Sequence, residues 1–337
     1  MRLLITGGMG FIGSAVVRHF LTTRDWQVLN VDKLTYAAAP ARLITISGHP
    51  NYQFAQADIA DGAAMDNLFG TFRPDAVLHM AAESHVDRSI HDAADFIRTN
   101  ITGSYILLET ARRHFDRLDA AGRARFRFHQ ISTDEVYGAL GPQGRFNEQS
   151  PYAPSSPYSA SKASADMLAR AWHRTYGLPV VISNSSNNYG PWQHPEKFIP
   201  AVLRSAMRGQ PITIFGDGTN VRDWLHVDDH AAALLAVLER GKIGETYGIG
   251  ADAERSNLAM AHTLCGLLDE MAPAGAPHAR LITHVGDRPG HDWRYALDSR
   301  KIRDTLKWSP QIRLEDGLRR TVRWYLDNRD WLDTITD

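Results

Sequence analysis

The sequence predicts an α/β fold: a doubly wound parallel sheet followed by a smaller region of mixed helix and strand. Short apolar runs alternate with helical patterns over the first half of the 337 residues, a glycine-rich turn follows the first run, and the alternation stops near residue 184. Such alternation requires crossovers that place helices on both faces of a parallel sheet. The predicted strands are Leu3–Thr6, Gln27–Val31, Tyr52–Ala57, Ala76–Met80 and Phe126–Ile131.

Helical patterns separate these strands. They cover Phe11–Leu21, Gly62–Phe69 and Ala93–His114. A further helix is predicted to begin at Ser156-Pro157, because serine is a good N-cap and proline fits the first helical position. Gly177 is a favourable stop for this helix, and Pro179–Ile182 is predicted to be the next strand.

The pattern changes after residue 184. Asn184–Pro200 is rich in Asn, Gly and Pro, as in an ordered binding loop. A short strand is predicted at Pro211–Phe215, and helices at Val227–Arg240, Leu258–Met271 and Glu315–Leu326. The length favours two domains. We expect one over residues 1–183, with 221–250 returning to it, and a second over 184–220 and 251–337.

The composition is that of an ordinary globular protein, with 43% hydrophobic and 22% charged residues. The net charge of −1 gives no electrostatic support for binding to nucleic acid or to a membrane surface. The single cysteine, Cys265, excludes an internal disulfide and fits a reducing compartment. The N-terminus does not resemble a signal peptide, and no apolar run has membrane-spanning length. We therefore expect a cytoplasmic protein.

A glycine-rich turn joins the first predicted strand to the first helix. Gly7, Gly10 and Gly13 recur every three residues, a relative of the dinucleotide-binding fingerprint. Such glycines bring the backbone close to a pyrophosphate, and the helix N-terminus offers free N–H groups to the anion. Asp32, at the end of the second strand, can hold the ribose hydroxyls. This context predicts a Rossmann-type domain with NAD as the cofactor, although Lys33 beside Asp32 leaves NADP open.

Two residues on the predicted helix after Ser156 supply hydride-transfer chemistry. Tyr158 and Lys162 are four residues apart, so they share one helix face. A nearby ammonium and the positive nicotinamide both stabilise a phenolate, which can take the proton of a substrate hydroxyl. Thr133, at the end of the preceding strand, is placed to hold that hydroxyl.

At these motifs the chain resembles the extended short-chain dehydrogenase/reductase family. The resemblance is closest to the members that are nucleotide-sugar 4,6-dehydratases acting on dTDP-glucose. It rests on TGGMGFIG (6–13), VDKLTYA (31–37), AAESHVDRSI (81–90), STDEVYG (132–138), YAPSSPYSASKA (152–163), SNNYGP (186–191), RDWLHVDDH (222–230) and DRPGHDWRYALD (287–298). These segments span nearly the whole chain, and the stretch between Gly138 and Glu148 is short relative to some members.

The resemblance implies a lyase that oxidises C4 of dTDP-glucose, eliminates water across C5 and C6, and returns the hydride to C6. The ketone at C4 makes the C5 proton removable. Glu135 is then the candidate base and Asp134 the acid that protonates the departing hydroxyl, which requires opposite protonation states in two adjacent carboxyls. Outside this context, Asp-Glu after a strand would indicate a solvated loop.

The resemblance also implies two sets of binding residues. The cofactor set is Gly7, Gly10, Phe11, Ile12, Gly13, Asp32, Lys33, Leu34, Thr35, Asp58, Ile59, Met80, Ala81, Ala82, Ser84, Thr99, Tyr158, Lys162 and Asn188. The nucleotide-sugar set is Ser84, Thr133, Glu135, Asn187, Lys197, Phe198, Thr213, Phe215, Arg222, Asn257, Asp287, Arg288 and His291.

Other functions remain open at this point. A nucleotide-sugar 4-epimerase or decarboxylase would use Tyr158 and Lys162 but leave Asp134 and Glu135 idle, and a protein that binds NAD without catalysis would keep only the fold. His226-x-x-x-His230 has a spacing that could bind a metal, but the pattern lacks the Glu of metalloproteases and we expect no metal. Apolar faces on the helices at Ala93–His114 and after Ser156, together with the resemblance, favour a homodimer.

Overall fold

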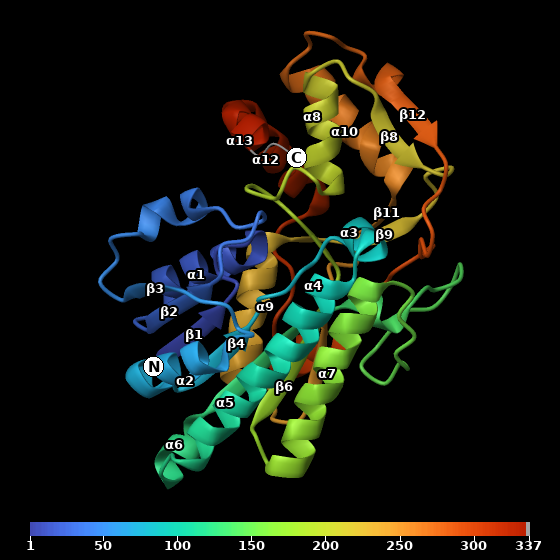
Figure 1. The fold of residues 1–337 in the computed structure, drawn as a ribbon. Helices are drawn as coiled ribbons and strands as arrows, with labels where there is room; N and C mark the ends of the chain where they lie inside the picture. The colour runs from blue at the N-terminus through green and yellow to red at the C-terminus, as the bar shows by residue number, and fades with distance from the viewer. Residues whose placement is uncertain (335–337) are drawn as a thin grey trace.

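The computed structural model describes residues 1–334, and a seven-stranded parallel sheet forms its centre (Figure 1). The strands are β1 (Arg2–Thr6), β2 (Gln27–Asp32), β3 (Tyr52–Gln56), β4 (Ala76–His79), β5 (Arg127–Thr133), β6 (Val180–Ser185) and β10 (Thr246–Ile249). Their order is β10-β6-β5-β4-β1-β2-β3. Strand order therefore reverses between β1 and β4, where a crevice opens at the carboxyl ends of parallel strands. Six of these strands were predicted; β10 was not.

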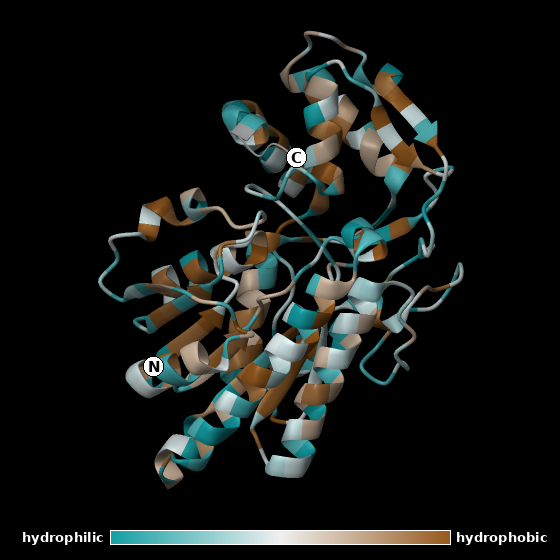
Figure 2. Ribbon diagram, viewed as in Figure 1, coloured by the Kyte–Doolittle hydropathy of each residue, from teal (hydrophilic) through white to brown (hydrophobic). Residues whose placement is uncertain are grey.

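Helices cover both faces of the sheet, as the sequence predicts. On one face lie α1 (Phe11–Thr23) and α9 (Val227–Arg240), and on the other α2 (Gly62–Phe72), α5 (Ser104–Asp116) and α7 (Pro157–Tyr176). The strands are apolar along most of their length, whereas the helices present polar residues outward (Figure 2). The doubly wound α/β fold is thereby confirmed.

Helix α7 begins and ends at the predicted residues. The Ser156 side chain accepts a hydrogen bond from the Ser159 backbone N–H, and the Ser159 side chain bonds back to Ser156, which completes a capping box. Gly177 follows the helix with φ of 70°, a left-handed conformation that costs glycine little. These two ends fix the position of Tyr158 and Lys162 along the helix.

The single helix predicted over Ala93–His114 is interrupted. A short α4 (Ala94–Phe96) leads into a π-helix, η2 (Ile97–Gly103), which continues into α5. A π-helix contains about one extra residue per turn, so the apolar stripe shifts around the helix axis at η2. The spacing of apolar residues alone did not indicate this insertion.

The smaller lobe combines two short sheets with helices. Strand β8 (Ile212–Phe215) pairs with β12 (Ile282–Val285), while β9 (Val221–His226) lies between β7 (Asn187–Tyr189) and β11 (Glu254–Ser256). The helices α8 (Phe198–Met207), α10 (Asn257–Met271) and α12 (Leu314–Asp327) pack around a separate apolar cluster. The segment Asn184–Pro200, predicted as an ordered binding loop, contains the end of β6, β7 and the start of α8.

The remaining elements are short: α3 (Val86–His91), α6 (Ala120–Arg125), α11 (Arg300–Leu306), α13 (Arg329–Thr334), and the 3-10 helices η1 (Pro40–Ile46), η3 (Asp134–Tyr137) and η4 (His278–Leu281). Helix α11 packs on α9, so the chain returns to the large lobe before its last helices. Cys265 is buried in α10. Within residues 1–334, no helix combines the length and apolarity needed to cross a membrane.

Candidate active site

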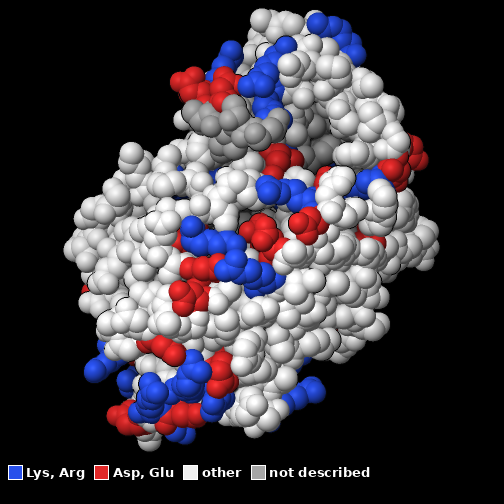
Figure 3. Space-filling model, viewed as in Figure 1, with Lys and Arg blue, Asp and Glu red and all other residues white. Residues whose placement is uncertain are grey.

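A cleft runs along the carboxyl ends of β1, β4 and β5 and extends beneath the smaller lobe. Charged side chains gather near the middle of this face, where the lobe meets the sheet (Figure 3). Most residues predicted for the cofactor line the cleft: Gly7, Gly10, Phe11, Ile12, Gly13, Asp32, Lys33, Thr35, Ile59, Met80, Ala81, Ala82, Ser84, Thr99, Tyr158, Lys162 and Asn188. The cleft also contains Thr133, Asp134, Glu135, Asn187 and Lys197.

The glycine turn has no room for side chains. A Cβ at Gly13 would lie 2.1 Å from the carbonyl oxygen of Gly7, and one at Gly7 would lie 2.7 Å from the backbone of Ala81. Gly7 also has φ of 77°. The turn can therefore bring bare backbone N–H groups to a pyrophosphate at the start of α1.

Asp32 and Lys33 are both engaged at the end of β2. The Asp32 carboxylate accepts hydrogen bonds from the N–H groups of Met9 at 3.0 Å and Leu34 at 2.8 Å. Burial raises the pKa of Asp32, and these bonds oppose the rise. The Lys33 ammonium donates to Thr99 Oγ1 at 3.0 Å and lies 3.4 Å from Glu83. Because a carboxylate already balances Lys33, the site favours the ribose hydroxyls of NAD over the 2′-phosphate of NADP.

The π-helix η2 supplies two residues to this side of the cleft. Thr99 accepts the hydrogen bond from Lys33. The Asn100 amide accepts from the backbone N–H of Glu83 and donates to Ser161 Oγ at 2.8 Å. Ser161 in turn donates to the carbonyl oxygen of Tyr158. Through Asn100, η2 thus connects the wall of the cleft to the helix that carries Tyr158.

Three consecutive residues at the end of β5, Thr133, Asp134 and Glu135, are the predicted acid–base group. Thr133 ends the strand and caps η3, because its Oγ1 accepts from the Glu135 N–H at 3.3 Å. The same oxygen donates to Asp134 Oδ1 at 3.3 Å. Burial and the charge of Glu135 raise the pKa of Asp134 well above its usual range. Asp134 is therefore suited to remain protonated at neutral pH.

Glu135 experiences a different field. Burial raises its pKa, but the cationic groups of Arg222, Lys197 and Arg288 oppose the rise. These cations come from β9, from the residue before α8 and from the segment after β12. Two adjacent carboxyls thus have opposed surroundings, as an acid and a base acting together require.

Tyr158 and Lys162 line the cleft from α7. Burial and then the charges of Glu135 and Asp134 raise the pKa of Tyr158, while a hydrogen bond with Thr133 lowers it. The Lys162 ammonium donates to the carbonyl oxygen of Ile131 at 2.7 Å. Burial lowers the pKa of Lys162. The tyrosine therefore needs further positive charge before it can act as a base.

The residues that line the cleft fit a nicotinamide dinucleotide. Beyond the glycine turn and Asp32, it is lined by His230, a buried residue whose Nδ1 lies 2.9 Å from Asn188 Oδ1. Because the Asn188 amide NH₂ donates to the Ser186 carbonyl, its oxygen faces His230 and must accept, so His230 carries its proton on Nδ1. His230 Nε2 and Asn187 Oδ1 then remain as buried polar atoms without a protein partner.

Comparison with known proteins agrees with this geometry. The model of a protein family described as GDP-mannose 4,6 dehydratase matches residues 4–321. The chain belongs to this family. The dTDP-glucose 4,6-dehydratase of Neisseria meningitidis serogroup B is 55% identical over 340 residues, covering 99% of this chain and 96% of the relative. The resemblance stated from the sequence is confirmed.

Solved structures of related enzymes have the same fold. A dTDP-glucose 4,6-dehydratase from Streptomyces venezuelae, crystallised with NAD, has a TM-score of 0.90 at 43% identity, and the alignment covers 100% of both chains. A UDP-glucose 4-epimerase from Thermotoga maritima has a TM-score of 0.85 at 30% identity, covering 98% of this chain and 100% of the other. The family scaffold therefore also occurs in enzymes of another activity.

Some predicted residues lie away from the cleft lining. Leu34 contributes only its backbone, and the carboxylate of Asp58 lies 3.1 Å from Arg98. Phe198, Thr213, Phe215, Arg222, Asn257, Asp287, Arg288 and His291 lie in the smaller lobe, outside the residues that line the cleft. His291 Nδ1 lies 2.6 Å from Asp287, whereas Arg288 pairs with Asp87 at 3.0 Å.

The structure adds residues to the cleft that the sequence did not indicate. Glu196 joins three segments, because it accepts from Tyr36 OH at 3.3 Å and lies 3.5 Å from His85 Nε2. Arg42, Glu83, His194 and His230 also line the cleft. Only His230 carried a signal, through its spacing from His226. Among residues 1–334, the structure contains no group of three or more His, Cys, Asp or Glu that could hold a metal.

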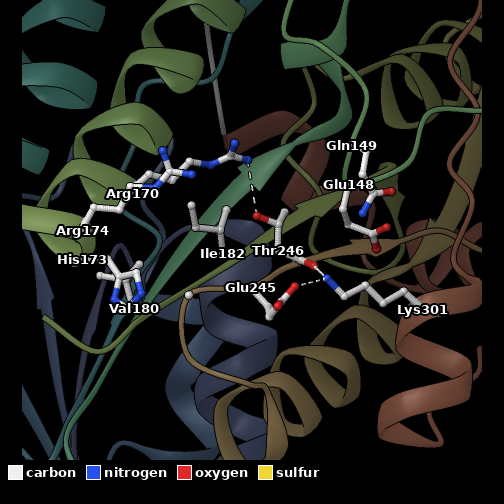
Figure 4. A pocket seen from close by; sticks show the side chains of 11 residues that line it. Glu148, Gln149, Arg170, His173, Arg174, Val180, Ile182, Glu245, Thr246 and Lys301 are labelled. Atoms are coloured by element: carbon white, nitrogen blue, oxygen red, sulfur yellow. Dashed lines mark hydrogen bonds and ion pairs between the residues drawn. The ribbon is translucent and has the colours of Figure 1, made fainter. Parts of the chain in front are cut away.

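A second, smaller hollow lies near the amino ends of β6 and β10, away from the acid–base group (Figure 4). Arg170 and Arg174 of α7 and Lys301 of α11 reach it. Lys301 is paired with Glu245 at 2.8 Å, and Arg170 donates to Tyr152 OH at 3.0 Å. Of these cations, Lys301 is balanced by a carboxylate, and the hollow lies apart from the cleft that contains Thr133, Asp134 and Glu135.

Proposed function

We propose that this protein is an NAD-dependent lyase that converts dTDP-glucose to its 4-keto-6-deoxy product with loss of water. One observation carries the proposal. Asp134 and Glu135 are adjacent at the end of β5, yet Asp134 is fully buried beside a negative charge while Glu135 faces three cations. An oxidoreductase needs neither carboxyl, whereas an elimination needs both a base and an acid.

Each residue has a role set by its surroundings. Tyr158, assisted by Thr133 and Lys162, takes the proton of the C4 hydroxyl. The glycine turn and Asp32 would hold NAD, which would supply a hydride acceptor for C4 and a hydride donor for C6. Glu135 removes the C5 proton, and Asp134 protonates the C6 hydroxyl as it departs as water. When the hydride returns to C6, C5 takes back a proton from Tyr158 or through a relay. Arg222 and Arg288 hold the diphosphate, since arginine can engage two anionic oxygens at once.

The epimerase alternative rests on the shared scaffold. Epimerisation leaves mass unchanged, whereas dehydration lowers it by one water. We expect purified protein incubated with dTDP-glucose to yield a product lighter by one water, with NAD unchanged at the end. A product of unchanged mass would favour an epimerase, and release of CO₂ from a nucleotide-linked uronic acid would favour a decarboxylase.

The remaining members of the nucleotide-sugar site are proposed from their place around the cations. Phe198 starts α8 next to Lys197, and Phe215 lies 6.4 Å from the His291 ring. Assays with a panel of dTDP- and UDP-hexoses would identify the nucleobase that the site accepts. The boundaries predicted from the sequence, 1–183 with 221–250 for the cofactor domain and 184–220 with 251–337 for the lobe, stay a prediction. Within residues 1–334, β9 at 221–226 pairs with β7 and β11 of the smaller lobe, and α11 packs on α9 of the large one.

A homodimer is proposed through the outer faces of α5 and α7. Ile97, Tyr105, Met167 and Tyr176 expose 45% to 53% of their surface there. Few charged residues appear over α7 in this view (Figure 3). Pairing these faces about a two-fold axis would bury the stripe. Analytical ultracentrifugation should give a mass of two chains, and Met167→Glu should reduce this mass to that of one chain.

A cytoplasmic location stays a prediction, supported by the reduced, buried Cys265.

A further inference from the structure

Behind the catalytic tyrosine and lysine lies a buried carboxylate that the proposed mechanism does not use. Asp166 follows Lys162 by one helical turn of α7 and is 0% exposed. Three donors converge on its Oδ2: Ser132 Oγ at 2.6 Å, Tyr152 OH at 2.9 Å and Asn184 Nδ2 at 3.5 Å. No sequence motif indicated this residue, although the i, i+4 spacing from Lys162 places both on one helix face.

The direction of these hydrogen bonds indicates an ionised Asp166. Arg170 donates to Tyr152 OH at 3.0 Å and lies over its ring, so the hydroxyl proton of Tyr152 is free to point at Asp166. The Asn184 amide can only donate through Nδ2. A carboxyl group that accepts from several donors is stabilised as the carboxylate. Burial raises the pKa of Asp166, and the charge of Lys162, the bonds from Ser132 and Tyr152, and the charge of Arg170 oppose the rise. All three donors bind Oδ2, and Oδ1 is buried without a hydrogen-bond partner among the described residues.

The Lys162 ammonium lies within the influence of this charge. Burial lowers the pKa of Lys162, and the charge of Asp166 raises it. The other titratable groups that face this pair are His79 on β4, Tyr137 in η3, Tyr152 before α7, and Tyr158 and Arg170 on α7. Burial lowers the pKa of His79 to about 3 and raises the pKa of each of these tyrosines, so all four are uncharged at neutral pH.

We propose that Asp166 is a positioning residue for the oxidation step: its buried charge keeps Lys162 protonated beside Tyr158, and its bond to Ser132 fixes the end of β5 that carries Thr133. The inference rests on the proposed function, since it concerns the proton removed from the C4 hydroxyl. It assigns the Tyr152–Arg170 pair a supporting role, because that pair orients one of the three donors. Arg170 reaches Tyr152 from the hollow seen in Figure 4.

The experiment isolates oxidation from water loss. In a Glu135→Gln parent, binding of dTDP-glucose should produce reduced cofactor, measured by its absorbance across pH. At high pH the signal should fall as Lys162 loses its proton. Adding Asp166→Asn should move this fall to lower pH by about one to three pH units, because an opposite charge near an ionisable group changes its pKa by that amount. Above the new limb, the signal should fall about tenfold for each further pH unit.

Two variants separate charge from shape. Asp166→Glu keeps the charge and should keep the high-pH limb of the parent, even where the overall signal is weaker. If Asp166→Asn instead lowered the signal equally at every pH, Asp166 would have a structural role and the proposal would be wrong. Absence of reduced cofactor in the parent itself, at every pH, would instead overturn the proposed function together with this inference.

A third variant keeps the inference testable should Asp166→Asn not fold. Tyr152→Phe removes one donor to Asp166 without changing any charge, which raises the pKa of the carboxyl. The low-pH limb of the signal should then move to higher pH by about one pH unit. An unchanged low-pH limb in folded Tyr152→Phe, judged by circular dichroism, would contradict an ionised Asp166 as the support of Lys162.

Discussion

The two walls of the cleft are built in different ways. On the cofactor side, short segments at the carboxyl ends of β1, β2 and β4 present backbone and small residues, and each segment is continuous in sequence. On the proposed substrate side, Lys197 before α8 lines the cleft, whereas Arg222 of β9 and Arg288 after β12 lie outside its lining. The charges of all three act on Glu135. One wall recognises by close backbone approach, and the other by charge collected from distant segments.

The difference teaches where each wall is sensitive. The glycine turn is sensitive to side-chain size, because a methyl group at Gly13 would overlap the Gly7 carbonyl oxygen. Electrostatic balance is the limiting quantity around Glu135, where burial and three cations act in opposite directions. Substitutions should therefore act through steric exclusion on one wall and through altered proton affinity on the other.

Glu135→Gln tests whether the two walls perform separable steps, and it should have the largest effect. Loss of the base should slow release of water by about 10²–10⁴-fold, the usual contribution of general acid–base catalysis. Reduction of bound NAD by dTDP-glucose should persist, because Tyr158 and Lys162 are unchanged. Stopped-flow absorbance and product mass measure the two steps. Simultaneous loss of both would make Glu135 a structural residue.

Gly13→Ala should damage only the cofactor wall. The added Cβ would meet the Gly7 oxygen at 2.1 Å and the Gly8 Cα at 2.8 Å. Overpacking of this kind costs about 1–3 kcal/mol, which corresponds to about a 5- to 150-fold weaker NAD affinity. Calorimetric titration of cofactor-free protein measures it. Gly70→Ala in α2, where nothing lies within 4 Å, is the control and should leave NAD affinity unchanged.

Arg222→Ala sharpens the description of the substrate wall. The guanidinium lies over the Tyr295 ring at 4.4 Å and donates to the Asp292 carbonyl at 2.9 Å. It also lowers the pKa of Glu135, so its removal should raise that pKa and move the low-pH limb of activity to higher pH. KM for dTDP-glucose should rise about tenfold or more, given about 1.5–3 kcal/mol for a charged hydrogen bond. Arg319→Ala, in an exposed pair with Glu270, should change neither quantity.

The smallest effect concerns the stability of the sheet. Burial lowers the pKa of His79 and His129, in β4 and β5, to about 3. Since the unfolded chain binds these protons near pH 6.5, the free energy of unfolding falls as pH falls from about 6.5 towards 3, by about 1.4 kcal/mol per pH unit for each histidine. His129→Leu should flatten this slope by that amount in urea titrations. An unaltered slope would show that His129 is protonated in the folded state.

Most residues predicted for the cofactor line the cleft, and they could be recognised because their signals are local. The glycines, Asp32 and the helix with Tyr158 and Lys162 each lie in one segment whose strand or helix can be recognised from spacing alone. Adjacent Asp134 and Glu135 were found for the same reason. The resemblance to known dehydratases supplied Arg222, Arg288 and Lys197, which spacing could not have brought together.

What the sequence did not predict depends on contacts between distant segments. Strands β7, β9 and β11 have three to six residues each and are stabilised by pairing with one another, so no local pattern marks them. Glu196 bonds to Tyr36, which is 160 residues away in the chain. Asp166 differs from ordinary helical acids only because Ser132, Tyr152 and Asn184 enclose it.

The π-helix η2 makes the length of this segment functionally fixed. Removing one residue from Ile97–Gly103 would restore regular α-helix and rotate everything before it by about 100°, the angle between successive helical residues. Thr99 and Asn100 would then turn away from Lys33 and Ser161, although no residue type near the substrate had changed. Families that share this scaffold should therefore accept substitutions here far more readily than single-residue deletions.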